Sequence, residues 1–339
     1  MLNFLHNIKR LLILFSYFSL RKILNFCLLY LSYKMSYFGL QKFKTRLPFF
    51  ISVEPANFCN LHCPECPVGN RKHTVPKQAT FDIQLYQKLI DELKPTLFHV
   101  ILYFQGEPLL HKNLYEMAKY AHDARIYTST STNAQFLTNS IANDIVASGL
   151  DKLIISVDGS TQEVYEKYRV GGKLQKALDG INYINDWKRK LKSVTPMIEM
   201  QFIVLKSNEH QMDEMKKLAK KYNVDRLVFK TAQLYDFENG HELLPTQNKY
   251  ARYQMESDGK YYIKAKQHNR CWRMWSGSVI NTQGQILPCC FDKSSEFSFG
   301  NIQENSFQKN WHNAKATDFR ASIWENRKQF EMCRNCTNN

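Results

Sequence analysis

The chain has 339 residues, of which 44% are hydrophobic and 23% are charged, and its formal net charge at pH 7 is +15. This length and composition are those of a soluble globular protein with one large domain or two and an ample core. The basic charge permits an anionic substrate or partner, but the chain has no recognisable nucleic-acid-binding motif, so nucleic acid is not an expected partner.

The cysteine content indicates a metal-binding protein of a reducing compartment. The nine cysteines are odd in number, most of them lie at short spacings, and the chain has no clear secretory signal. Such usage favours metal ligation in the cytoplasm over disulfide bonds. We therefore expect a cytoplasmic protein.

Residues 1–47 are expected to form a basic, apolar helical arm. Two apolar runs, Leu11 to Leu20 and Ile23 to Tyr33, are separated by Arg21 and Lys22. Each run is about half of the ~20 residues that cross a bilayer. The first 53 residues carry eight Lys or Arg and no Asp or Glu. Two interpretations remain open: the arm lies on the inner face of the membrane as a peripheral contact, or it covers part of the core domain with its cations in solvent.

Three cysteines, Cys59, Cys63 and Cys66, follow the first strand-like stretch with C-x3-C-x2-C spacing. Three thiolates so close together can hold one metal centre. Because [4Fe–4S] clusters usually take four cysteines, a trio either takes a distant fourth ligand or leaves one iron free. The alternative is a zinc knuckle completed by His62 or His73.

Residues 48–245 alternate between strand-like and helical patterns, which predicts a parallel sheet wrapped by helices. The expected strands are Phe49–Glu54, Phe98–Phe104, Ile126–Ser131, Leu153–Val157, Met197–Leu205 and Arg226–Lys230. The expected helices are Ile83–Leu93, Leu114–Ala124, Ile141–Ser148, Leu174–Leu191 and Gln211–Tyr222. Ser160 and Asn208 are expected to cap helices.

Polar residues follow several of these strands. In parallel α/β folds the functional residues lie at the carboxyl ends of the strands, although each such residue could also be a turn or cap residue. Lys230, at the end of the sixth strand, could face the same edge. The candidate binding residues are Gly106, Glu107, Asn133, Ser156, Asp158 and Arg169.

Residues 246–339 carry the remaining cysteine groups. Asn248 to Asn269 is expected to be an irregular linker, and Ser278–Asn281 with Gln285–Leu287 is expected to form a β-hairpin. Four thiolates suffice for a closed cluster, and a four-cysteine zinc site is the alternative. Adjacent strand residues point to opposite faces, so only one cysteine of the 289–290 pair is expected to ligate. The expected ligands are Cys271, Cys289, Cys333 and Cys336, with Cys290 as the alternative to Cys289.

The cysteine trio and the polar residues after it resemble those of the radical S-adenosylmethionine superfamily. The resemblance implies a partial (β/α)6 TIM-like barrel. It also implies a [4Fe–4S] cluster on the trio, whose fourth iron binds the amino and carboxylate groups of S-adenosyl-L-methionine. Gly106 and Glu107 would bind the amino group of this cofactor, and Ser131-Thr132-Asn133 matches a Thr-Asn-Gly motif. Ser156 and Asp158 would bind the ribose, and Arg169 the carboxylate. Three positions depart from the family pattern: Glu65 replaces an aromatic residue, and Gln105 and Ala134 each replace a glycine.

The C-terminal part resembles the SPASM/twitch extension of the same superfamily, a β-hairpin plus helix. This resemblance implies one auxiliary [4Fe–4S] cluster. Together the two resemblances imply an α/β enzyme that reductively cleaves S-adenosylmethionine to a 5′-deoxyadenosyl radical. The electrons would come from a donor such as flavodoxin or ferredoxin.

The expected reaction is an oxidation of a small molecule or a peptide, in which the auxiliary cluster accepts an electron. Carbon–carbon bond formation or rearrangement is a further reaction of this family. No general acid or base is identified from the sequence. The alternative from another class is a non-catalytic zinc- or Fe–S-binding scaffold at the membrane surface.

Overall fold

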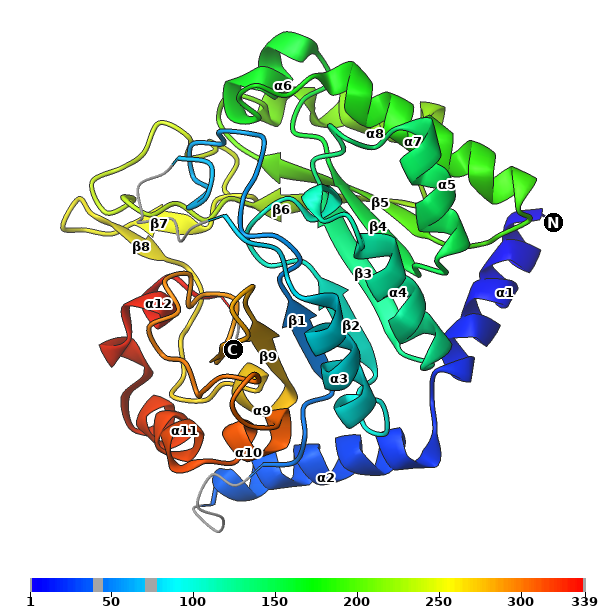
Figure 1. The fold of residues 1–339 in the computed structure, drawn as a ribbon. Coiled ribbons are helices and arrows are strands. Elements are labelled where there is room, and N and C mark those ends of the chain that lie inside the picture. The colour runs from blue at the N-terminus through cyan, green and yellow to red at the C-terminus, as the bar shows by residue number, and fades with distance from the viewer. Residues whose placement is uncertain (1, 39–44, 71–77, 338–339) are drawn as a thin grey trace.

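Strands and helices alternate along residues 50–231 of the structure, a computed structural model that describes residues 2–38, 45–70 and 78–337 (Figure 1). The strands are β1 (Phe50–Val53), β2 (His99–Leu102), β3 (Tyr127–Thr132), β4 (Lys152–Ser156), β5 (Met197–Val204) and β6 (Arg226–Thr231). The helices between them are α3 (Ile83–Leu93), α4 (Leu114–Asp123), α5 (Asn139–Ala147), α6 (Gln162–Tyr168), α7 (Leu174–Lys190) and α8 (Met212–Lys221). Each predicted strand and helix is present, with its ends shifted by a few residues.

The strands form one sheet in the order β10-β9-β1-β2-β3-β4-β5-β6. Neighbours from β1 to β6 are all parallel, as the expected partial (β/α)6 barrel requires. Beyond β1 the sheet continues with β9 (Gly277–Ile280), which is parallel to β1, and β10 (Ile286–Leu287), which is antiparallel to β9. The predicted C-terminal hairpin is therefore confirmed, and it extends the sheet that carries the cysteine trio.

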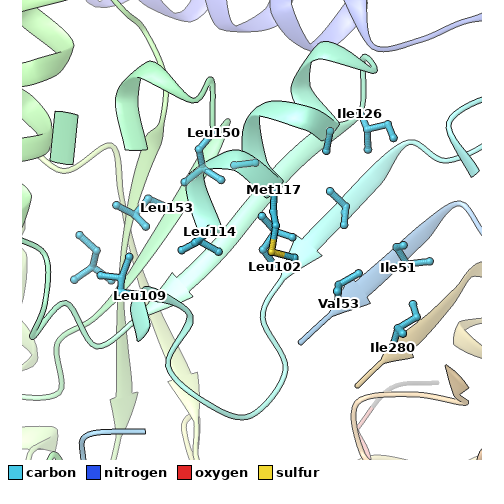
Figure 2. Close-up of a cluster of buried hydrophobic side chains, with 14 of the residues drawn as sticks. Ile51, Val53, Leu102, Leu109, Leu114, Met117, Ile126, Leu150, Leu153 and Ile280 are labelled. Atoms are coloured by element: carbon cyan, nitrogen blue, oxygen red, sulfur yellow. The ribbon is translucent and has the colours of Figure 1, made fainter. Parts of the chain in front are cut away.

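The main core lies between this sheet and its helices. Helix α3 begins after Asp82, whose carboxylate accepts a hydrogen bond from the backbone N–H of Leu85 at 2.7 Å. Its buried residues recur every three or four positions, so one face of the helix packs on the sheet. These residues are Tyr86, Leu89, Ile90 and Leu93. Figure 2 shows the adjoining cluster. It includes Ile51 and Val53 of β1, Leu102 of β2, Ile280 of β9 and Met117 of α4.

The C-terminal region is less irregular than expected. The segment from Asn248 to Asn269 was predicted to be an irregular linker, but it contains a two-stranded antiparallel hairpin, β7 (Tyr253–Met255) and β8 (Tyr261–Ile263). The turn holds Gly259 at a φ of +78°, a conformation that favours glycine. The other elements of this region are α9 (Arg273–Ser276), α10 (Phe307–Trp311), α11 (Ala314–Asn326) and α12 (Glu331–Arg334).

Both predicted helix caps differ from those in the structure. Helix α6 is capped by Thr161 and not by Ser160, because the Thr161 hydroxyl accepts the bond from the backbone N–H of Val164. Asn208 begins a short 3-10 helix, but its side chain does not cap that helix. Its amide instead donates to the carbonyl of Asp158 at 3.0 Å, which ties the ends of β4 and β5 together.

The N-terminal arm consists of α1 (Leu2–Ser16) and α2 (Leu20–Ser36), bent by 79° at the break between them. In the described part of the chain no single helix is long and apolar enough to span a bilayer, whereas this bent pair passes that test on length and composition. The hydroxyl of Tyr17 donates to Asp151 at 2.6 Å, and the ring of Phe18 packs 4.6 Å from that of Phe98. The arm therefore covers part of the core domain.

The contacts of the arm place it at one end of the barrel. They are made with residues that immediately precede the strands: Phe49 before β1, Phe98 before β2, Arg125 before β3, Asp151 before β4 and Val194 before β5. Figure 1 shows both helices running along this edge of the sheet. The arm thus lies across the amino-terminal rim of the barrel, and the polar residues singled out above follow the opposite ends of the strands.

Candidate active site

The cysteine trio lies on the loop that follows β1. Cys63 is buried, and Cys59 and Cys66 are partly buried. The backbone N–H of Leu61 points at the sulfur of Cys59 at 3.4 Å, and a turn is closed by the bond from the N–H of Cys66 to the carbonyl of Cys63. Burial raises the pKa of the Cys59 thiol to about 12 and also raises that of Cys63, so bound metal would have to replace the thiol protons.

Side-chain donors from the end of β3 and from the C-terminal end of α6 reach these sulfurs. The amide of Asn133 lies 3.6 Å from the sulfur of Cys59, and Nη1 of Arg169 lies 3.7 Å from the sulfur of Cys63. Three sulfur ligands with N–H groups directed at them fit an iron–sulfur cluster, whose thiolates such groups stabilise. Among the described residues, no three His, Cys, Asp or Glu side chains are arranged to hold a single metal ion. Of the alternative zinc ligands, His62 has Nδ1 at 3.3 Å from the carbonyl of Gly69, and His73 lies outside the described residues.

The Gly106-Glu107 pair connects the end of β2 to the cysteine loop and to the end of β3. A Cβ on Gly106 would lie 2.1 Å from the carbonyl oxygen of Ala56, so only glycine fits there. The Glu107 carboxylate accepts hydrogen bonds from Thr132 Oγ1 at 2.6 Å and from the N–H of Asn133 at 2.9 Å. It also caps the 3-10 helix that follows it. Burial raises the pKa of Glu107, and these donors oppose that shift.

Asp158 and Arg169 form a buried ion pair beside the trio. Asp158 is fully buried; its Oδ1 accepts from the N–H of Ile203 at 2.6 Å, and its Oδ2 accepts from Nε of Arg169 at 2.5 Å. Burial disfavours the charge on Arg169, but Asp158 and Cys63 favour it and together raise its pKa well above the ordinary value. Asp158 therefore positions Arg169, and a contact of Asp158 with a ribose stays a prediction.

A cavity of about 430 Å³ opens at this edge of the sheet. Cys63, Cys66, Ser156 and Arg169 line it, and so does Lys230, whereas Gly106, Glu107, Asn133 and Asp158 are not part of its wall. The structure thus brings the predicted residues together around one site, some on the wall and some behind it. Which of them bind a cofactor stays a prediction.

Several wall residues were not singled out from the sequence. Tyr103 directly follows β2, so the strand-end rule could have found it, whereas Gln201 lies in the middle of β5. Arg252 and Lys293 come from the C-terminal segment and belong to no motif. Glu65, the departure noted above, lines the cavity and accepts a bond from the N–H of Tyr235 at 3.0 Å.

Gln105, another departure from the family pattern, also has a structural role. The amide of Gln105 donates to the carbonyl of Lys293 at 2.9 Å and so ties the end of β2 to the C-terminal region. A glycine at position 105 could not make this bond.

The four C-terminal cysteines predicted as ligands are all buried: Cys271, Cys289, Cys333 and Cys336. Cys289 interacts electrostatically with Cys271 and Cys333, and Cys271 does so with Cys336. Burial raises the pKa of Cys333 to about 11, and the nearby Arg327 guanidinium lowers it. Four buried thiols grouped around one cation are a donor set that suits a closed cluster.

Cys290 also interacts electrostatically with Cys289, and its sulfur has a further partner. Nη1 of Arg273 donates to its sulfur at 3.0 Å, and both residues line a second cavity of about 250 Å³. Tyr103, Phe104 and Lys293 line both this cavity and the larger one. The two cavities therefore adjoin and form a path from the cysteine trio toward Cys289 and Cys290.

Comparison with known proteins gives two family matches. A model of the radical SAM superfamily matches residues 53–201, and a model of the SPASM iron–sulfur cluster-binding domain matches residues 271–337. The chain is 24% identical over 307 residues to the AdoMet-dependent heme synthase of Methanosarcina barkeri, covering 80% of this chain and 84% of that protein. It is 25% identical over 257 residues to the PqqA peptide cyclase of Rhizobium meliloti, covering 68% and 64% of the two chains.

Among solved structures, that of Streptococcus suis SuiB bound to S-adenosylmethionine shares the fold. The TM-score is 0.62 at 15% sequence identity, and the match covers 90% of this chain and 74% of SuiB.

Proposed function

Because this chain belongs to the radical S-adenosylmethionine superfamily and carries an iron–sulfur cluster-binding SPASM domain, we propose that it cleaves S-adenosylmethionine to a 5′-deoxyadenosyl radical and abstracts hydrogen from a substrate. One observation carries the proposal: sulfur atoms with N–H groups directed at them lie at the edge of a cavity large enough for a cofactor and part of a substrate. When bound, the catalytic cluster supplies the electron that cleaves S-adenosylmethionine, and the auxiliary cluster supplies an acceptor for the electron that an oxidised substrate releases.

The chain itself holds and orients the reactants. Cys59, Cys63 and Cys66 hold the catalytic cluster, and Arg169, fixed by Asp158, presents its remaining N–H groups to the carboxylate of the cofactor. A guanidinium positioned by a buried carboxylate loses little freedom when it binds, so the orientation of the cofactor is set before the substrate arrives.

The proposed reaction is a two-electron oxidation. The substrate loses a hydrogen atom to the 5′-deoxyadenosyl radical, and the resulting substrate radical then loses one electron and one proton. The cavities between the cysteine trio and Cys289 support this proposal, because a substrate held there would lie between the hydrogen acceptor and the second cluster. The reducing electrons would come from flavodoxin or ferredoxin.

The substrate is proposed to be a peptide or a small molecule with an acidic group. PqqA peptide cyclase, by its name, acts on a peptide, and AdoMet-dependent heme synthase makes a small molecule. The cavity wall holds the basic side chains Lys230, Arg252 and Lys293 against one carboxylate, Glu65, which already accepts a bond from the chain. This excess of basic side chains favours an anionic substrate.

The deciding experiment uses the full chain, reconstituted without oxygen. Iron and sulfide are counted, dithionite and S-adenosylmethionine are added, and 5′-deoxyadenosine is measured by mass spectrometry. We expect about eight irons per chain and formation of 5′-deoxyadenosine. Replacement of Cys59, Cys63 and Cys66 by Ala removes about four irons and all cleavage. Cys27→Ala, at an exposed cysteine of the arm, is the matched control and changes neither.

Other outcomes decide between the alternatives. About four irons with intact cleavage would keep the enzyme but remove the auxiliary cluster. Tightly bound zinc without cleavage would reject the proposal and favour the non-catalytic scaffold.

A further inference from the structure

Helix α2 of the arm buries polar side chains beside Leu29 and Tyr33 and exposes several large apolar side chains. Lys22 and Asn25 are buried and bond to the carbonyls of residues 125 and 47, at 2.5 and 2.9 Å. On the opposite side Leu20 is 81% exposed and Leu24 is 55% exposed. In a surface helix of a soluble protein the face turned to solvent is normally polar, so the exposed apolar face of α2 is unusual.

In each helix of the arm the most exposed apolar side chains recur every three or four residues and so lie on one face of that helix. We call these two apolar faces together the outer stripe. Each member is between 46% and 81% exposed: Leu11, Leu12, Phe15, Leu20, Ile23 and Leu24. An apolar surface of this extent marks a site of contact with another molecule or with a membrane.

The charged side chains that the arm itself exposes are all cations. Lys9, Arg21, Lys34 and Arg46 are exposed, and the first 53 residues include no Asp or Glu. Two copies of the chain that met through this surface would bring eight uncompensated cations together, which disfavours self-association. An anionic bilayer surface matches both features, because its headgroups attract the cations and its acyl region accepts the apolar side chains.

From this combination we propose that the arm docks on the surface of an anionic lipid bilayer, with α1 and α2 lying in the interfacial plane. The arm covers the amino-terminal rim of the barrel, and the cysteine trio follows the carboxyl end of β1 (Figure 1). The catalytic cavity of the docked protein therefore opens away from the bilayer, toward the aqueous phase. The reducing conditions that the cysteines require place it on the cytoplasmic leaflet.

The test is flotation of the full, reconstituted chain with vesicles of phosphatidylcholine containing about one quarter phosphatidylglycerol. We expect the wild-type protein to float with these vesicles. Leu12→Glu combined with Leu24→Glu should lower the bound fraction about ten-fold or more, because it places charge in the acyl region. The matched control is Met255→Glu, at a side chain that is 64% exposed on β7 and far from the arm in sequence, which should float as the wild type does.

Two further measurements separate this proposal from others. Arg21→Gln should weaken binding to the anionic vesicles roughly five-fold and leave the weak binding to pure phosphatidylcholine unchanged. The Leu12/Leu24 variant should retain the unfolding temperature and the 5′-deoxyadenosine yield of the wild type, which shows that it is folded and that docking is independent of catalysis.

The proposal is overturned if the wild-type protein does not float, or if the Leu12/Leu24 variant floats equally well. It is also overturned if neither protein floats and sedimentation in the absence of lipid shows that the wild type is a dimer and the Leu12/Leu24 variant is a monomer. The outer stripe would then be an interface between copies of the chain.

Discussion

Arg169 donates through Nε to Oδ2 of Asp158 at 2.5 Å while its Nη1 lies 3.7 Å from the sulfur of Cys63. One guanidinium thus joins the end of β4 to the cysteine loop that follows β1. The planar fork of arginine makes both contacts at once, and a lysine ammonium on a flexible stem would not hold the same geometry. The position of the loop and the orientation of the cofactor therefore depend on the same side chain.

Replacement of Arg169 by Lys tests this dependence. We expect the dissociation constant for S-adenosylmethionine to rise roughly ten- to a hundred-fold, because the charge is kept but the fork is lost. Equilibrium dialysis of the reconstituted protein measures it. The control is Arg189→Lys, since the Arg189 side chain is 78% exposed and pairs only on the surface. Unchanged affinity in the Arg169 variant would exclude a role in cofactor binding.

The two adjacent cysteines after β10 can be distinguished by single substitutions. Cys289→Ala should remove about four irons per chain, because Cys289 is buried and interacts with the buried thiols of Cys271 and Cys333. Cys290→Ala should leave the iron content unchanged, because its sulfur accepts from Arg273 instead. Iron analysis and electron paramagnetic resonance of the reduced proteins measure both. The reverse pattern would assign the cluster to Cys290.

Gly106→Ala is expected to destabilise the protein by about 1–3 kcal/mol or more. The added Cβ would lie 2.1 Å from the carbonyl of Ala56 and 2.7 Å from that of Phe58, and backbone atoms cannot move aside as flexible side chains do. The displaced loop carries Cys59, so the iron content of the catalytic cluster should fall as well. Urea unfolding and iron analysis check the two effects. If the stability and the iron content of the variant both equalled those of the wild type, the loop would be shown to accommodate a Cβ at position 106.

Glu54, at the end of β1, makes stability depend on pH. Burial raises its pKa from 4.5 to about 7 in the folded protein, although the N–H of Thr282 donates to it and opposes the shift. The folded state thus binds more protons than the unfolded state between these two values, so this group makes stability fall as pH rises through that range. Above about pH 7 the full cost of the buried charge is present.

Glu54→Gln removes this titration. The variant should therefore gain stability relative to the wild type as pH rises, by about 1 kcal/mol between pH 6 and pH 8. Urea unfolding of the reconstituted proteins at the two pH values measures the difference. A difference that stays constant with pH would show that Glu54 does not titrate in this range.

Much of the fold follows from local patterns in the sequence. Strands such as β4, with Leu153, Ile154 and Ile155 in succession, are apolar runs, and helices such as α3 show apolar residues at every third or fourth position, so their types and order could be predicted. The β7–β8 hairpin was missed because each of its strands is only three residues long, too short to show a strand pattern. Its Asp258-Gly259 turn was the available signal.

The site was predictable only where residues follow a strand in a recognisable motif. Cys59, Cys63 and Cys66 are such residues, and the structure places them with the polar ends of β2, β3 and β4. Lys293 and Arg252 reach the cavity from segments more than 180 residues away in sequence from the trio, and no local pattern records that contact. The exposure of apolar side chains on α2 could likewise not be predicted, because the sequence shows an apolar stripe but not which side of the helix faces the barrel.

The pairing of β9 with β1 has a consequence for any attempt to separate the two halves of the chain. All four residues of β1, from Phe50 to Val53, are paired with β9 on one side and β2 on the other. A fragment that ended near residue 245 would leave β1 as an edge strand with a row of unpaired N–H and C=O groups, which promotes aggregation. The strand that leads into the cysteine trio is therefore an interior strand only while the C-terminal segment is attached.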